Sequence, residues 1–211
     1  LNDYTTFDKR PLQLVSSSED NLDLMFYTTD NKLVQSKDLF FVPFVDNKRV
    51  VAGEPITVAK DDSVVISFRA FASQDSMSDG DSYLEYRYQV NGNSYEVDFD
   101  IVFHNLDQTV KANPDMDLSW QNRMLRQEKV DPSARNSRNP NKDPERFYSN
   151  IFYKPSKDNV DELKRGGNAE KSTSSSLQWI AYKQQFFCAI LMSDSNFESA
   201  EMRCSTNGEE S

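Results

Sequence analysis

The sequence is poor in the residues that most metal centres and nucleotide sites use. It has one histidine, two cysteines and six glycines among 211 residues. A zinc site needs three or four ligands, and His104 with the separated Cys188 and Cys204 does not supply them. The glycines form no Gly-x-Gly-x-x-Gly, Walker or Gly-x-Ser-x-Gly motif. The sequence therefore predicts no metal and no cofactor, and argues against nucleotide binding and α/β-hydrolase chemistry.

Long apolar runs are also absent. The longest are residues 39–45, which Pro43 interrupts, and residues 186–192. Neither approaches the roughly 20 residues that span a bilayer, and both fit buried strands. The chain starts at Leu1 with no signal-like segment, so we expect either a removed leader or a piece of a longer protein.

Net positive charge is lacking as well. Asp and Glu total 34 against 24 Lys and Arg, a formal charge of −10. An acidic surface repels phosphates, so nucleic acid binding is not expected.

One stretch, residues 123–146, is locally basic. The simple interpretation is a solvated loop, and the alternative is contact with anionic lipid headgroups, worth about 1 kcal/mol per well-placed cation. The cations are Arg123, Arg126, Lys129, Arg135, Arg138, Lys142 and Arg146, against Glu128, Asp131, Asp143 and Glu145.

Aromatic residues are plentiful, and they follow strand periodicity. Phe and Tyr dominate an aromatic content of 12%, which favours strands. Residues 83–90 and 95–104 each alternate apolar and polar side chains around Asn91-Gly92, the strongest local signal for a hairpin. We expect Gly92 to supply the positive φ of the tight turn.

The remaining segments predict one all-β domain over residues 1–211, with at most short helices. The best helix candidate is 121–129, and 158–165 is expected to form a turn or two. Composition predicts irregular loops near 130–146 and 164–176. Further strands are expected at 22–27, 39–45, 55–59, 63–72, 116–120, 147–153, 177–182, 185–192 and 199–204.

Several residues resemble functional sites, but each has a simpler interpretation. Residues 75–81 resemble a calcium loop, yet the required ligand positions are Met77 and Tyr86, so a polar turn is favoured. Glu96, Asp98 and Asp100 share one strand face, which is typical of a solvated surface more than of a catalytic pair. His104 lies on the same polar face and is expected to be half exposed.

The cysteines and tryptophans leave two alternatives open each. Cys188 lies in an apolar run and is expected to be a buried free thiol. A disulfide with Cys204 would require adjacent strands and an oxidising compartment. Trp120 and Trp179 are expected in the core by their strand alternation, although either could stack on a sugar ring.

Five segments follow one another along the chain: 4–12 (YTTFDKRPL), 82–88 (SYLEYRY), 95–101 (YEVDFDI), 127–129 (QEK) and 177–187 (LQWIAYKQQFF). In this order they resemble the large periplasmic domain of the YidC membrane protein insertases of Gram-negative bacteria. The resemblance covers about residues 4–200, and its last segment is the most specific.

The resemblance implies a β-supersandwich similar to galactose mutarotases. It implies a non-catalytic periplasmic domain of an inner-membrane protein that helps to insert and fold client membrane proteins. Clients or components of the Sec translocon are the implied partners, and an exposed sheet edge or aromatic-lined cleft is the implied means of contact, by strand addition. The insertase core lies outside this chain, so no groove residue is carried over and the binding residues are unknown.

Two other functions fit an all-β envelope protein. A carbohydrate-binding or mutarotase-like sugar-active domain would share the fold, but such chemistry usually recruits histidine and only His104 is available. A secreted β-sandwich of the adhesin type is the third hypothesis, and the segment 177–187 argues against it.

Overall fold

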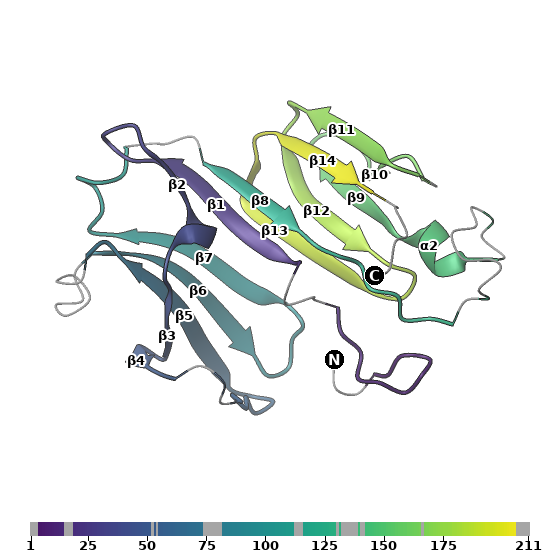
Figure 1. Ribbon diagram of the computed structural model, residues 1–211, viewed down its shortest axis with the longest axis horizontal. Helices are drawn as coiled ribbons and strands as arrows, with labels where there is room; N and C mark the ends of the chain where they lie inside the picture. Colours follow the sequence, from purple (N-terminus) through teal and green to yellow (C-terminus); the bar gives the residue numbers. More distant parts are fainter. Residues whose placement is uncertain are drawn as a thin grey trace. The chain divides into compact units, whose positions relative to one another are not determined.

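The computed structural model describes residues 4–14, 19–51, 53, 55–73, 82–111, 116–129, 131, 139, 142–165 and 167–205 (Figure 1). The fold is all-β, as the sequence predicts. The chain forms two compact units: a central unit, Asn21–Trp120, and a terminal unit that combines Leu1–Asp20 with Gln121–Ser211.

The central unit is a two-layer sandwich. One layer is a three-stranded sheet in the order β2-β1-β8, and the other is a five-stranded sheet in the order β4-β3-β5-β6-β7. Apolar side chains of both layers, such as Phe26 and Leu84, meet in one buried core. The elements are β1 (Asn21–Tyr27), β2 (Leu33–Gln35), the 3₁₀ turn η1 (Ser36–Asp38), β3 (Val42–Val45), β4 (Lys48–Arg49), β5 (Ser63–Phe71), β6 (Tyr83–Asn91), β7 (Val97–His104) and β8 (Asp117–Gln121).

The hairpin predicted around Asn91-Gly92 is confirmed as β6 and β7. The strands pair in one register from Tyr83 with His104 to Val90 with Val97. The role predicted for Gly92 is wrong, because positive φ among the described glycines occurs at Gly53. Gly92 is needed for space instead, since a Cβ there would lie 1.9 Å from the Ala59 carbonyl oxygen.

The terminal unit also has two layers. A four-stranded sheet in the order β10-β9-β12-β13 packs against a two-stranded sheet of β11 and β14. Tyr153 and Leu177 from the larger sheet and Met202 from the smaller one are buried between them. The elements are α2 (Pro144–Tyr148), β9 (Asn150–Pro155), β10 (Asp161–Glu162), β11 (Ala169–Thr173), β12 (Leu177–Lys183), β13 (Cys188–Phe197) and β14 (Ala200–Cys204).

Four local predictions of secondary structure are wrong. Residues 158–165 form no helical turn, because Asp161–Glu162 is β10 and pairs with β9. Residues 121–129 are not helical: Gln121 ends β8 and the rest is irregular, because its backbone groups bind other segments. Residues 55–59 form no strand and are mostly exposed, so the alternation of Ile56 and Val58 is not used to bury a strand face. The loop expected at 164–176 contains β11, whose polar sequence pairs with β14 along its whole length, a partner that local composition does not reveal.

Two broader expectations, the single domain and the supersandwich arrangement, stay predictions. In the part of the chain that the structure describes, no helix is both long and apolar enough to cross a membrane.

Candidate functional site

Three of the five segments that resemble the insertase family meet in the terminal unit. They come from the N-terminal segment 4–14, the irregular segment 122–129 and the turn 184–187 between β12 and β13. Together with helix α2 these segments are called the junction below. Figure 1 shows the N-terminal segment, in purple, close to the turn between β12 and β13, and Tyr4 contacts Phe187 directly with ring centroids 5.8 Å apart.

The N-terminal segment is held by main-chain and side-chain bonds to Gln127. The Phe7 N–H donates to the Gln127 carbonyl at 3.1 Å. The Gln127 Nε2 donates to the Gln13 carbonyl at 2.7 Å. Gln127 is buried, so these bonds are shielded from water and fix the position of the N-terminal segment.

The turn between β12 and β13 is held by Gln184. Its Nε2 donates to the Leu125 carbonyl at 3.1 Å, and its N–H donates to the Phe187 carbonyl at 2.7 Å. The Gln184 Oε1 is buried without a partner beside a cavity of about 20 Å³. A cavity of this size has room for one water molecule, but apart from the Gln184 Oε1 much of its lining is apolar, with Leu14, Met124 and Phe187.

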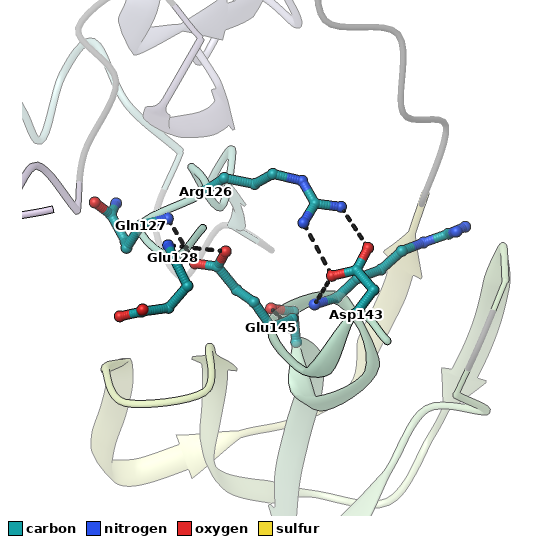
Figure 2. Close-up of polar contacts among 7 residues, drawn as sticks. Arg126, Gln127, Glu128, Asp143 and Glu145 are labelled. Atoms are coloured by element: carbon teal, nitrogen blue, oxygen red, sulfur yellow. Dashed lines mark hydrogen bonds and ion pairs between the residues drawn. The ribbon is translucent and has the colours of Figure 1, made fainter. Parts of the chain in front are cut away.

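A buried ion pair joins segment 122–129 to α2. Figure 2 shows the Arg126 guanidinium reaching the Asp143 carboxylate at the start of the helix. The pair is bidentate, with N–O distances of 2.9 and 2.8 Å. The Asp143 side chain is 1% exposed and also accepts a bond from the Arg146 N–H at 3.3 Å, which caps the helix. One carboxylate therefore serves both as helix cap and as counter-ion.

Glu145 forms the second connection in Figure 2. Its carboxylate accepts bonds from the N–H groups of Gln127, at 2.6 Å, and Glu128, at 3.3 Å. Burial raises the pKa of Glu145 above its usual value, because desolvation disfavours the charged form more than the two N–H groups favour it. These bonds occupy the backbone donors that a helix at 121–129 would have needed.

The junction uses part of the basic stretch internally. Arg126 is bound to Asp143, and Arg123 forms an ion pair with Glu19 at 2.6 Å. Arg135 and Arg138 lie outside the described residues. Two of the cations predicted for lipid contact are thus committed to the protein's own structure.

Large apolar side chains are exposed at several places in the terminal unit, two of which lie at the junction and on β13. At the junction, Tyr4, Phe7 and Phe186 are 49%, 54% and 64% exposed. On β13, Ile190 and Met192 are 53% and 58% exposed. These two lie opposite Ala181 and Trp179 of β12, on the sheet face that points away from the buried core.

Other polar clusters lie outside the junction and were missed from the sequence. On the central sheet, Arg69 pairs with Glu85 at 2.8 Å, and its guanidinium lies 4.4 Å from the Phe44 ring centre and 4.8 Å from that of Tyr83. Their sequence positions carry no common motif, because pairing between three strands brings them together.

A second missed cluster lines a hollow of about 550 Å³ beside β10 and β11. Lys171 binds both Asp161 and the Tyr153 hydroxyl. The hydrogen bonds that Asp161 accepts from Lys171 and then from the Tyr153 hydroxyl lower the pKa of Asp161 to about 2. All three groups satisfy one another, so the cluster is read as an ion-pair network.

The acidic and histidine candidates on β7 lie at the surface. Asp98 is exposed, and Asp100 binds Arg87 at 2.9 Å in an exposed ion pair. Glu96 precedes the strand and is exposed. The His104 ring stacks on Tyr83 with centres 4.7 Å apart. The structure brings none of these carboxylates into a paired arrangement.

The remaining candidates have mixed outcomes. Cys188 and Cys204 are both free, but Cys188 is exposed rather than buried, because it starts β13 on the face turned away from the core. Trp120 and Trp179 are half-buried and belong to neither buried core. The calcium-like residues 75–81 lie outside the described part. Within that part, no group of three or more His, Cys, Asp or Glu could hold a metal ion.

Comparison with known proteins gives one consistent result. The chain is 31% identical to the membrane protein insertase YidC of Porphyromonas gingivalis over 204 residues, 96% of the chain. It is 28% identical to that of Bacteroides fragilis over 204 residues, and 26% identical to that of Chloroherpeton thalassium over 206 residues. The chain covers 27%, 28% and 31% of these relatives. No family model matches, and no solved structure matches.

Proposed function

The chain is homologous, over nearly its whole length, to one segment of the YidC membrane protein insertases, and from this premise we propose that it is the large periplasmic domain of such an insertase. The domain is non-catalytic and serves as an interaction module in the insertion and folding of inner-membrane proteins. Its partners are client membrane proteins or components of the Sec translocon.

The single observation that carries the proposal is the extent of the match. Eight relatives at 23–31% identity align with 96–97% of the chain, and all are named YidC insertases. A match limited to one motif would support only a shared local structure. The full-length match, with relatives that carry this name, also favours the insertase domain over the carbohydrate-binding alternative.

The first test of the proposal is the sequence of the encoding gene beyond both ends of the chain. One apolar helix upstream and several spans of about 20 apolar residues downstream are expected. A stop codon soon after Ser211, with a cleavable signal upstream, would remove the assignment.

The exposed apolar side chains of β13 support the interaction role. Ile190 and Met192 lie on the outer sheet face, where large exposed apolar residues that lie together often mark contact sites. A photoreactive phenylalanine analogue at position 192, in the full-length insertase in cells, is expected to form adducts with client membrane proteins or Sec components.

The matched control is the same analogue at Tyr95, which is 89% exposed in the turn between β6 and β7 of the central unit. Position 95 is expected to form few adducts. The same adduct pattern at both positions would show that exposure alone, and not the β13 face, determines the crosslinks.

A further inference from the structure

We propose that the aromatic tip of the junction, formed by Tyr4, Phe7 and Phe186, docks on the surface of an anionic phospholipid bilayer. The inference rests on the proposed function, since the relatives are named as membrane protein insertases, whose work takes place at a membrane. It assigns the contact to particular side chains and moves it from the basic stretch 123–146 to the two loops at the junction.

The two loops that carry the aromatic rings of the tip are held in place by hydrogen bonds. The N-terminal segment closes on itself through the Leu12 N–H, which donates to the Tyr4 carbonyl at 3.1 Å, and Leu12 is buried. Gln127 and Gln184 hold the two loops against segment 122–129. Because the loops are already ordered, little conformational entropy is lost when the rings contact a surface.

The rings are of the type that binds at a membrane interface. Tyr and Trp are enriched where lipid headgroups meet the hydrocarbon, and Phe inserts its apolar ring at the same boundary. Phe186 is 64% exposed, the most exposed ring of the tip. The adjacent Phe187 packs on Tyr4 and is half-buried, so the fold partly covers one ring of the Phe186-Phe187 pair and exposes the other.

The charge around the tip is opposite to that of the whole chain. Segments 4–14, 122–129, 142–148 and 183–188 carry eight Lys or Arg and four Asp or Glu, whereas the chain carries −10 overall. Glu19 and Asp20, which bind Arg123, reduce this excess without cancelling it. Two of the four acids, Asp143 and Glu145, are buried. Asp143 is balanced by its ion-pair partner Arg126, and the remaining charge of these segments, with Glu19 and Asp20 included, is still positive and complements anionic headgroups.

The shape of the junction favours a bilayer over an extended peptide. Peptide recognition requires a groove or a strand edge with pockets for side chains. The cavity at the junction measures about 20 Å³, which is too small for any side chain. The exposed rings of Tyr4, Phe7 and Phe186 do not line this cavity, and a flat, deformable surface is the partner that protruding rings fit.

The test is flotation of the 211-residue chain with vesicles. Phosphatidylcholine vesicles that contain about 30% phosphatidylglycerol are compared with pure phosphatidylcholine, and about 0.5 M NaCl is added to screen the charges. The chain is expected to float with the anionic vesicles, less with neutral ones and less at high salt. The double variant Phe7→Ala with Phe186→Ala is expected to lower the bound fraction roughly five-fold.

The matched control is the double variant Phe40→Ala with Tyr95→Ala, in the central unit. These residues are 81% and 89% exposed, so the control removes a similar amount of exposed ring surface, and thermal unfolding followed by circular dichroism checks that both pairs fold. The proposal is overturned if the chain does not float, or if the control pair weakens flotation as much as the tip pair does. It is also overturned if the tip pair lowers binding of a soluble apolar peptide and leaves flotation unchanged, because the tip would then be a peptide site.

The flotation test and the crosslinking test can fail separately. Vesicle binding contains no client and no Sec component, while crosslinking at position 192 depends on neither Phe7 nor Phe186. Loss of flotation with retained crosslinking would refute the membrane contact alone.

Discussion

Arg126 and Asp143 show how single residues determine the local structure of the terminal unit. The Asp143 side chain is 1% exposed and that of Arg126 23% exposed, and their two bonds connect an irregular segment to a helix of five residues. A buried charge without its partner is far more costly than the pair is stabilising. Removal of one partner is therefore expected to lower the free energy of unfolding by more than the small number of bonds suggests.

Asp143→Ala is expected to lower the free energy of unfolding by about 3–5 kcal/mol. The substitution leaves the Arg126 guanidinium without its counter-ion and removes the cap of α2. Urea denaturation measures the change. Asp100→Ala is the control, because its pair with Arg87 is exposed on both sides, and it is expected to cost less than about 1 kcal/mol. Equal losses in the two variants would show that the Arg126 pair is no more desolvated than a surface pair.

Glu145 is expected to make the fold less stable as the pH rises. Its pKa in the folded state lies above the ordinary value of 4.5 because it is buried. The folded protein therefore holds this proton more tightly than the unfolded chain does, so the stabilisation is full below 4.5 and is lost as the pH rises through the folded pKa.

The measurement is urea denaturation of the wild type and Glu145→Gln at several pH values from about 4 to 7. The wild type is expected to lose stability relative to the variant as the pH rises. A difference that stays constant over this range would mean that Glu145 has the same pKa in both states.

At the scale of elements, backbone hydrogen bonds determine two local structures that the side-chain pattern predicts wrongly. Residues 122–129 contain helix formers, yet their N–H groups bind the carboxylates of Asp20 and Glu145. Gly92 lies in a turn that the sequence identifies, but its N–H donates to the Asp62 carbonyl at 3.0 Å. The turn between β6 and β7 is thereby packed against the turn that precedes β5.

Gly92→Ala is expected to destabilise the central unit by about 1–3 kcal/mol, the usual range for overpacking. The new Cβ would lie 1.9 Å from the Ala59 carbonyl oxygen and 2.6 Å from its carbon, so the backbone must move. Thermal unfolding measures the loss. Asn93→Ala, one residue further along the same turn and exposed, is expected to change stability little. A tolerated Gly92→Ala would show that the two turns separate easily.

At the scale of the whole molecule, the path of the chain through the two units affects the cooperativity of unfolding. The terminal unit combines both ends of the chain, and the central unit lies between them in sequence. The strands at the two crossings, β1 and β8, are neighbours in one sheet. Fraying of the central unit at this sheet therefore affects both chain segments that enter the terminal unit.

We expect the chain to unfold as one domain, and the two tryptophans allow a direct test. Trp120 reports on the central unit and Trp179 on the terminal unit, so Trp120→Phe and Trp179→Phe each leave one fluorescent probe. Coincident urea transitions in the two variants are expected for a single cooperative domain. Leu84→Ala and Leu177→Ala, each expected to cost about 2–5 kcal/mol, should then shift both probes. A shift confined to the probe of the mutated unit would divide the chain into two domains.

The sequence by itself determined the strands whose two faces differ. Period-two alternation shows which side chains are buried within each strand, and this is a local property. The pairing of β6 with β7 therefore followed from residues 83–104 alone, and all-β architecture followed from repetition of the same pattern. The order of five short segments was likewise enough to indicate the insertase resemblance, which the relatives confirm.

The tertiary structure alone decided which distant groups meet. The counter-ion of Arg126 lies 17 residues away, the partner of β11 lies some 30 residues away, and Gln127 binds Gln13 across 114 residues. Ion pairs and main-chain bonds of this kind leave no periodic pattern in the sequence. An acceptor or a counter-ion forms the same bond whether it lies near its partner in the chain or far from it. The junction and its exposed rings, and with them the proposed contact surface, appear only when the folded backbone brings these segments together.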